Sequence, residues 1–274
     1  MILTVNDLAF RYKSHDTLKD ICFDIQQGEL TVILGPNGVG KTTLLKCLNK
    51  ILMPQHGDIF VGKKNVRTMN IKEVARHIAY VAQTSEAARM TVFDAILMGR
   101  GPHIRYRVSK DDLIKVDAVI RHLNLSKLSL KYLNQMSGGE LQKVCIARAL
   151  VQQTDLLLLD EPTASLDLKN QTHILGLIRH IIKDHNMAAV MTMHDLNTAM
   201  RYADKYIFLK NGAIYSTGNI CDITPQMVED VYDVKVDIMR HKGLPIVIPR
   251  EDPEDLVEDL VEKTTLSVTD ERAA

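Results

Sequence analysis

The stretch from residue 30 to residue 50 constrains the fold of this chain more than any other. It begins with an apolar run at 30–34, continues through a glycine-rich loop at 35–42 and ends in residues that favour a helix. A loop of the form G-x-x-x-x-G-K-T between a buried strand and a helix is the context that identifies a phosphate-binding loop. The apolar run therefore predicts a buried strand, and the whole unit predicts a site for phosphate groups.

The residues of this loop have separate predicted tasks. Its glycines let the backbone curl so that N–H groups point inward at phosphate oxygens, and the following helix adds the positive end of its dipole. Lys41 would supply charge to the outer phosphates, and the Thr42 hydroxyl is placed to bind magnesium. The predicted nucleotide site comprises Gly35, Pro36, Asn37, Gly38, Val39, Gly40, Lys41, Thr42 and Thr43.

A second apolar run, at 156–159, ends in two acidic residues. A strand parallel to the first would deliver Asp160 beside the magnesium, and Glu161 would orient or deprotonate the attacking water. Alone, an apolar run followed by two acids is more often structural than functional. Together with the glycine loop it favours a functional interpretation, in which ATP and Mg²⁺ are bound and ATP is hydrolysed.

Composition and charge are those of an ordinary globular protein. A chain of 274 residues can form one large domain or one domain with a smaller insert. Acidic and basic residues balance at 34 each, so no net positive field draws the chain to nucleic acid. No apolar run approaches the ~18 residues that a bilayer span needs. The N-terminus lacks the layout of a signal peptide, so the chain is expected to stay where it is made.

Cysteines and histidines predict neither a disulfide nor a metal site. The four cysteines lie far apart without a C-x-x-C pair, as expected for thiols in a reducing compartment. His180 and His185 are five residues apart, which does not place two ligands on one face of a helix. No metal site is therefore predicted from the ten histidines.

The apolar pattern predicts an α/β protein with a mostly parallel sheet and helices on both faces. Together with the glycine-rich loop, this gives a P-loop NTPase core. Strands are expected at 2–10, 21–25, 30–34, 156–159, 188–193, 234–239 and 244–248, and core helices at 42–50, 139–151, 168–185 and 196–203. Apolar residues have helical spacing at 90–98, 110–124 and 126–133, and no run typical of a buried strand lies among them. This pattern indicates an inserted helical subdomain.

The predicted organisation has three parts. Residues 1–83 and 136–250 form the ATP-binding core, with N-terminal antiparallel β strands and C-terminal strands, and residues 84–135 form the helical subdomain. The acidic stretch 251–274 is expected to be a solvated or flexible tail.

A second phosphate-type feature lies at Met136-Ser137-Gly138-Gly139-Glu140. A serine and two glycines open a predicted helix, which makes another anion-binding helix N-terminus. One ATP cannot occupy both sites in a single chain. The motif resembles the signature of the nucleotide-binding subunits of ABC transporters, and the resemblance covers about residues 1–250. It implies that Ser137, Gly138 and Gly139 of one subunit cover the γ-phosphate held by the other, so that two sites form across a homodimer.

The resemblance assigns tasks to two residues that precede the insert. Tyr12 follows the first strand, where the family has an aromatic residue that stacks on adenine; ordinary packing is the alternative for a lone tyrosine. Gln83 matches the glutamine that touches magnesium and the attacking water and that links the helical insert to the core. A lone glutamine would otherwise be a surface residue, so this prediction depends on position alone.

Two further matches follow the acidic pair. The stretch 165–167 matches the loop that crosses the dimer interface, and Asp167 is equally suited to cap the next helix. His194 matches the histidine that contacts the γ-phosphate, although a lone histidine at a strand end more often packs. Glu161 is then the expected general base, with His194 and Gln83 as the other catalytic residues. The expected magnesium ligands are Thr42, Gln83 and Asp160.

This chain departs from the family pattern at two signature positions. Residue 136 is Met rather than the usual Leu, which changes packing but not chemistry. Residue 140 is Glu rather than the commoner Gln, which adds a negative charge near the site. The serine and both glycines are kept, so these departures put the rate in question rather than the role.

The lack of a membrane segment indicates the importer class, whose cassettes dock on separate permease subunits. The stretches 91–103 and 244–249 resemble cassettes for iron–siderophore, haem and cobalamin uptake. These features imply a peripheral protein on the cytoplasmic face of the cell membrane, which acts with a permease and indirectly with a substrate-binding protein. The apolar face of the helix at 90–98 is suited to a permease helix; packing on its own core is the alternative.

A soluble ABC ATPase is the rival class. DNA-repair members carry long coiled coils between the halves of the site, and translation factors carry two cassettes, and this chain has neither. An ATPase of an assembly system, such as that for iron–sulfur clusters, stays open. A degenerate subunit without hydrolysis is disfavoured because Glu161 and His194 are both present.

Overall fold

The computed structural model describes residues 1–13, 15–83, 89–164 and 166–250, and its centre is a six-stranded sheet. The strand order is β10-β9-β3-β8-β7-β6, and neighbours are parallel except for β10, which is antiparallel to β9. The mostly parallel sheet is therefore confirmed. The strands are β3 (Leu30–Leu34), β6 (Ile78–Val81), β7 (Leu156–Asp160), β8 (Ala188–Thr192), β9 (Lys205–Lys210) and β10 (Ala213–Asn219).

The N-terminal strands form a separate antiparallel sheet in the order β2-β1-β4-β5. Its strand β2 begins at His15, earlier than the predicted start at residue 21, because β1 pairs with it along its whole length. That pairing reaches Tyr12 opposite His15, beside an exposed ion pair between Arg11 and Asp16. The strands are β1 (Leu3–Tyr12), β2 (His15–Ile25), β4 (His56–Val61) and β5 (Lys64–Asn65).

The two faces of the central sheet are covered differently. Along β7, Leu157 and Leu159 belong to one buried apolar cluster, and Leu156 and Leu158 belong to the other, as the alternation of strand side chains requires. The first cluster contains side chains of α5 (Gly138–Leu150), α6 (Leu168–Asp184) and α7 (Leu196–Tyr202). The second contains α1 (Lys41–Leu48) and the N-terminal sheet. Helices therefore lie on both faces of the sheet, as predicted, and the N-terminal sheet shares the second face with α1.

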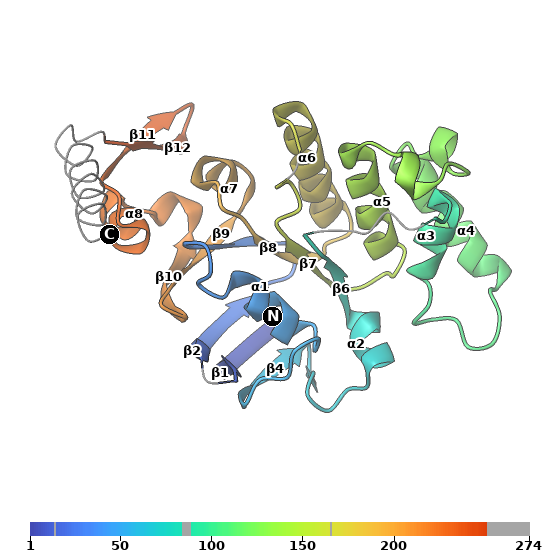
Figure 1. Cartoon of the computed structure of the whole chain (residues 1–274), viewed down its shortest axis with the longest axis horizontal. Coiled ribbons are helices and arrows are strands. Elements are labelled where there is room, and N and C mark those ends of the chain that lie inside the picture. The colour runs from blue at the N-terminus through green and yellow to red at the C-terminus, as the bar shows by residue number, and fades with distance from the viewer. Residues whose placement is uncertain (14, 84–88, 165, 251–274) are drawn as a thin grey trace, which may run out of the picture.

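Three helices gather at one end of the molecule, where Figure 1 shows α3 (Val92–Met98), α4 (Lys110–His122) and α5 in green. The helix expected at 126–133 is wrong: two short 3-10 turns, η1 (Ser126–Leu128) and η2 (Leu133–Gln135), stand there instead. The chain between them extends to pair with the start of α3, through a bridge between Thr91 and Tyr132. These backbone bonds replace the helical bonds that the apolar spacing predicts.

A buried ion pair ties these helices together. The Arg100 Nε atom lies 2.9 Å from Asp112 Oδ1, and both side chains are almost fully buried. Arg100 also donates to the carbonyl oxygen of Val151, just past α5, at 2.9 Å. Hydrogen bonds from Ser109, followed by that from Arg100, lower the pKa of Asp112 to about 2. The start of α4 is therefore anchored to the end of α5 through one charged side chain.

The remaining helices and the C-terminal hairpin complete the fold. The predicted strand pair is confirmed as the hairpin of β11 (Val236–His241) and β12 (Leu244–Pro249), which packs on α7 at the end of the molecule opposite α3 and α4 (Figure 1). None of the helices in the described parts of the chain is long and apolar enough to cross a bilayer. The acidic stretch 251–274 lies outside the described residues. The other helical elements are α2 (Ile71–His77), η3 (Ile220–Asp222) and α8 (Pro225–Tyr232).

We expect Gly99→Ala to destabilise the contact between α3 and α5. A Cβ atom at Gly99 would lie 2.2 Å from the carbonyl oxygen of Arg148 and 2.6 Å from Val151 Cγ1, so the helices would have to separate. Overpacking of this kind costs about 1–3 kcal/mol. Gly176→Ala is the matched control, because nothing among the described residues lies within 4 Å of a Cβ there, and alanine favours a helix. Denaturant unfolding checks both variants; an unfolding free energy of Gly99→Ala equal to that of Gly176→Ala would contradict the expectation.

Candidate functional site

The glycine-rich loop leaves the carboxyl end of β3 and leads directly into α1. Its three glycines have positive φ angles, 146° at Gly35, 79° at Gly38 and 109° at Gly40. At Gly35 a Cβ atom would lie only 2.4 Å from the carbonyl oxygen of Leu209 on β9. The loop therefore needs glycine both for its backbone conformation and for its close approach to the neighbouring strand.

Lys41, the first residue of α1, is buried beneath this loop. Its Nζ atom donates to the carbonyl oxygens of Gly35 at 2.7 Å and Pro36 at 3.0 Å. Burial lowers the pKa of Lys41, while the carboxylates of Glu161 and Asp160 act in the opposite direction. The ammonium group is thus already directed into the curl of the loop, where a phosphate would meet it.

The sequence analysis gives no hint of a second contact to this loop. The Gly35 N–H donates to the hydroxyl of Tyr232 at 2.9 Å, which ties the loop to the last turn of α8. Burial raises the pKa of Tyr232 to about 12, so its hydroxyl is neutral at physiological pH. No local pattern predicts this contact, because 197 residues separate the two partners.

Asp160, at the end of β7, is held by three hydroxyl groups from three different elements. The hydroxyls of Thr42 and Thr192 donate to its Oδ1 atom at 2.9 and 2.8 Å, and the Tyr80 hydroxyl donates to Oδ2 at 3.2 Å. Burial, and then the charge of Asp160, raise the pKa of Tyr80, which keeps that hydroxyl protonated as a donor. Sequence reasoning predicts Thr42 and Asp160 here but misses Tyr80 and Thr192.

These donors fit magnesium. The hydroxyl of Thr42 and the carboxylate of Asp160 meet at the start of the phosphate-binding helix, and both present oxygen atoms, which Mg²⁺ prefers. Magnesium usually keeps several waters and takes one or two protein oxygens beside phosphate oxygens. Two protein donors, Thr42 and Asp160, are therefore sufficient.

Glu161 lies between the loop and the end of β8. Gln83 donates its amide N–H to Glu161 Oε2 at 2.9 Å, so the glutamine that follows β6 reaches the predicted general base. One hollow brings Glu161 together with loop residues 37, 38 and 40–43, and another brings it together with His194. The structure therefore places all three predicted catalytic residues, Glu161, Gln83 and His194, around one region at the carboxyl ends of the parallel strands.

The signature serine caps α5. Ser137 accepts the Glu140 N–H at 3.4 Å, while both the N–H and the hydroxyl of Ser137 donate to Glu140 Oε2, at 2.9 and 3.0 Å. Glu140 therefore completes a capping box, and the hydrogen bond from the Ser137 backbone is the first cause that lowers the Glu140 pKa. The capping function accounts physically for a glutamate at this position.

The signature residues do not join the hollows that contain Glu161. Neither hollow is lined by Ser137, Gly138 or Gly139. A Cβ atom at Gly139 would lie 2.9 Å from the Asn170 side chain, so the start of α5 packs closely on the start of α6. Within one chain the signature turn is thus a separate feature from the glycine-rich loop.

Tyr12 and Asp167 line neither of the two hollows that contain Glu161. The Tyr12 ring at the end of β1 is 46% exposed and meets the edge of Phe10, with ring centroids 4.8 Å apart, so it remains accessible for stacking. Asp167 caps α6, where its Oδ1 atom accepts the N–H of Asn170 at 2.8 Å. Ser165, in the same predicted loop, lies outside the described residues.

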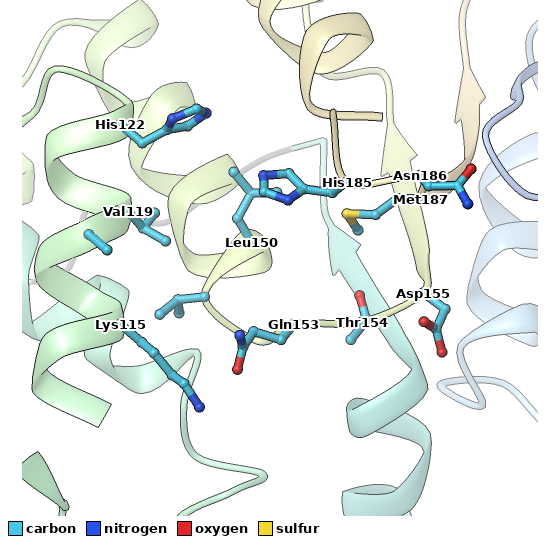
Figure 2. Close-up of a pocket in the computed structure, with 12 residues that line it drawn as sticks. Lys115, Val119, His122, Leu150, Gln153, Thr154, Asp155, His185, Asn186 and Met187 are labelled. Carbon is cyan, nitrogen blue, oxygen red and sulfur yellow. The ribbon is translucent and has the colours of Figure 1, made fainter. Parts of the chain in front are cut away.

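A further cavity lies between α4, the end of α5 and the connection from α6 to β8 (Figure 2). Figure 2 shows Val119 and His122 on α4 across from Leu150 and His185. Thr154, just before β7, also lines this cavity. The cavity thus borders the amino end of β7, whereas the glycine-rich loop follows the carboxyl end of the parallel strand β3. It is therefore separate from the candidate nucleotide site.

Comparisons with known proteins agree with this geometry. The family model for ABC transporters matches residues 18–164. An uncharacterized ABC transporter ATP-binding protein of Methanocaldococcus jannaschii is 48% identical over 91% of this chain and 98% of its own length. The iron(3+)-hydroxamate import ATP-binding protein of Bacillus subtilis is 32% identical over 86% of this chain and 90% of its own length.

A solved structure of a related protein has the same fold. It is that of a metal-chelate type ABC transporter in an inward-facing conformation, and one of its chains is 29% identical to this chain. The TM-score is 0.79, over 91% of this chain and 97% of that chain.

Proposed function

This chain belongs to the ABC transporter family, and on that premise we propose that it is the ATP-hydrolysing subunit of a membrane importer for a metal chelate. The observation that carries the ATPase part is the contact of Asp160 with Thr42 at 2.9 Å, with Glu161 next in the chain and bonded to Gln83. This arrangement supports a magnesium site and a general base at one phosphate-binding loop.

The proposed reaction assigns a task to each of these groups. The loop N–H groups and Lys41 would hold the phosphates, and Thr42 and Asp160 would hold magnesium, which would neutralise charge on the phosphate oxygens. Glu161 takes a proton from the water that attacks the γ-phosphorus, as the bond from that phosphorus to ADP breaks. Gln83 orients the glutamate and the water. His194 stabilises the charge that develops on the phosphoryl group.

The signature turn implies that two copies act together. Ser137, Gly138 and Gly139 lie outside the hollows with Glu161, so in this proposal they cover the γ-phosphate bound by a second copy. The capping box uses the N–H groups of Ser137 and Glu140, so the N–H groups of Gly138 and Gly139 at the start of α5 would meet that anion. Hydrolysis then depends on closure of the dimer, and Asp167, beside the start of α6, faces the partner copy. Closure is the motion that would drive the permease.

The relatives support a metal chelate as the imported compound. The proteins named for petrobactin and iron(3+)-hydroxamate import match this chain over 86% of its length. We therefore place the chain on the cytoplasmic face of the membrane, bound to permease subunits that receive a chelate from a substrate-binding protein. The rival, a soluble ATPase of an assembly system, is not favoured by these relatives.

We expect uptake of one chelate to depend on this protein. Removing the chain from its native cell should reduce uptake of one compound among radiolabelled iron–hydroxamate, haem and cobalamin to background. The wild-type chain should restore it and a Glu161→Gln chain should not, because uptake needs turnover. Purification of the tagged chain in detergent should recover an integral membrane permease. Unchanged uptake of all three compounds, together with recovery of soluble assembly proteins, would contradict transport.

A further inference from the structure

Thr192, the last residue of β8, contacts both acidic residues at the end of β7. It is fully buried and stands directly opposite Asp160 in the strand pairing. Its hydroxyl donates to Asp160 Oδ1 at 2.8 Å and accepts the N–H of Glu161 at 2.9 Å. The single hydroxyl of Thr192 thus donates to the carboxylate of one acidic residue and accepts from the backbone of the next.

The backbone of Glu161 is in an unusual conformation. Its φ angle is 43°, in the left-handed region that side chains other than glycine rarely adopt. Such a conformation persists only where the surroundings hold it, and it is common at functional sites. Here the N–H of the strained residue has its partner in the Thr192 hydroxyl. In this conformation the Glu161 side chain meets Gln83 and lines the hollow beside the glycine-rich loop.

We propose that Thr192 is a positioning residue for hydrolysis, because its hydroxyl holds the Glu161 backbone in the conformation that directs the general base at the attacking water. This inference rests on the proposed ATPase function. Thr192 stands two residues before His194, so the end of β8 sets both the base and the charge-stabilising histidine.

Asp160 depends less on Thr192 than Glu161 does. The Asp160 carboxylate keeps two other hydroxyl donors, Thr42 and Tyr80, when Thr192 is changed. The Glu161 N–H, in contrast, donates to the Thr192 hydroxyl itself, so this hydrogen bond is lost with that hydroxyl. Loss of that hydroxyl should therefore alter the rate of the chemical step far more than the affinity for magnesium or ATP.

The test compares Thr192→Val with two matched variants. Valine keeps the shape and removes the hydroxyl, whereas Thr192→Ser keeps the hydroxyl. Thr31→Val removes another buried threonine hydroxyl of the same sheet, one that has no hydrogen-bond partner among the described residues. We expect kcat for MgATP to fall about 10- to 100-fold in Thr192→Val with KM within threefold. Thr192→Ser and Thr31→Val should stay within threefold of wild type.

A second measurement does not depend on activity. With ¹⁵N-glutamate labelling, the Glu161 amide should exchange its proton faster in Thr192→Val than in wild type, Thr192→Ser or Thr31→Val. Equal kcat in Thr192→Val and Thr31→Val, or an equal loss of kcat in Thr192→Ser, would overturn the inference. If the wild-type chain hydrolyses no ATP, the proposed function is wrong. Independently of any activity, an unchanged exchange rate of the Glu161 amide in Thr192→Val would overturn the positioning role of Thr192.

Discussion

Glu161→Gln is expected to lower ATP turnover about 100-fold or more while ATP still binds, and to hold two copies of the chain together as a dimer. The glutamine cannot accept the proton of the attacking water, and general-base catalysis is worth about 10²–10⁴ in rate. Its amide oxygen can still accept the bond from Gln83, and the backbone bond to Thr192 is unchanged. The site should therefore close around ATP without reopening. Phosphate release and light scattering with saturating ATP and magnesium measure the two effects.

Glu140→Gln is the matched control for this experiment. It makes the same chemical change at the signature turn, where glutamine can also complete a capping box with Ser137. Turnover should stay within a few-fold of wild type, and no trapped dimer should form. A Glu161→Gln chain that stays monomeric with saturating ATP and magnesium would show that the two-copy site is wrong.

Lys41→Ala is expected to weaken ATP binding at least about 100-fold. The Lys41 ammonium lies buried under the loop with the carbonyl oxygens of Gly35 and Pro36 as its partners, so its charge faces the phosphate position with little screening by water. Hydrogen bonds and charge interactions of this kind with a phosphate are worth several kcal/mol at such sites. Titration calorimetry with ATP and magnesium measures the loss.

Lys46→Ala, in the last turn of the same helix, serves as the control for removing a lysine from α1. It should leave the dissociation constant for ATP within threefold of wild type, because Lys46 lies at the opposite end of the helix from the loop. If Lys41→Ala retained wild-type affinity, the assignment of residues 35–43 as the phosphate site would be incorrect.

Features that depend on local pattern follow from the amino-acid order. The runs at β3, β7 and β8 are apolar and short because parallel strands are covered on both faces, so their burial is readable directly. The loop at residues 35–42 is predicted by glycine spacing, since only glycine adopts those φ angles freely. The capping box at Ser137 and Glu140 has a local S-x-x-E pattern as well, but the sequence interpretation treats Glu140 only as an added charge.

Features that depend on residues distant in the chain are not predicted by local sequence patterns. The helix expected at 126–133 is replaced by an extended connection, because pairing with the start of α3 satisfies its backbone. The pattern analysis also misses β9 and α8, although the run at 206–209 is apolar. With α8 it misses Tyr232, which the hydrogen bond from Gly35 connects to the site.

By itself the sequence determines that this chain binds phosphate at a glycine-rich loop and carries an acidic pair at the end of a second buried strand. Glycine conformations, apolar runs and charged residues at strand ends act over a few residues, and their physical basis is local. The tertiary structure alone decides how the acidic pair is held, because Thr192, Tyr80 and Thr42 reach Asp160 from three separate elements. The register of β7 against β8 sets the contact of Thr192 with Asp160, and with it the hydrogen bond from Thr192 to the left-handed backbone of Glu161.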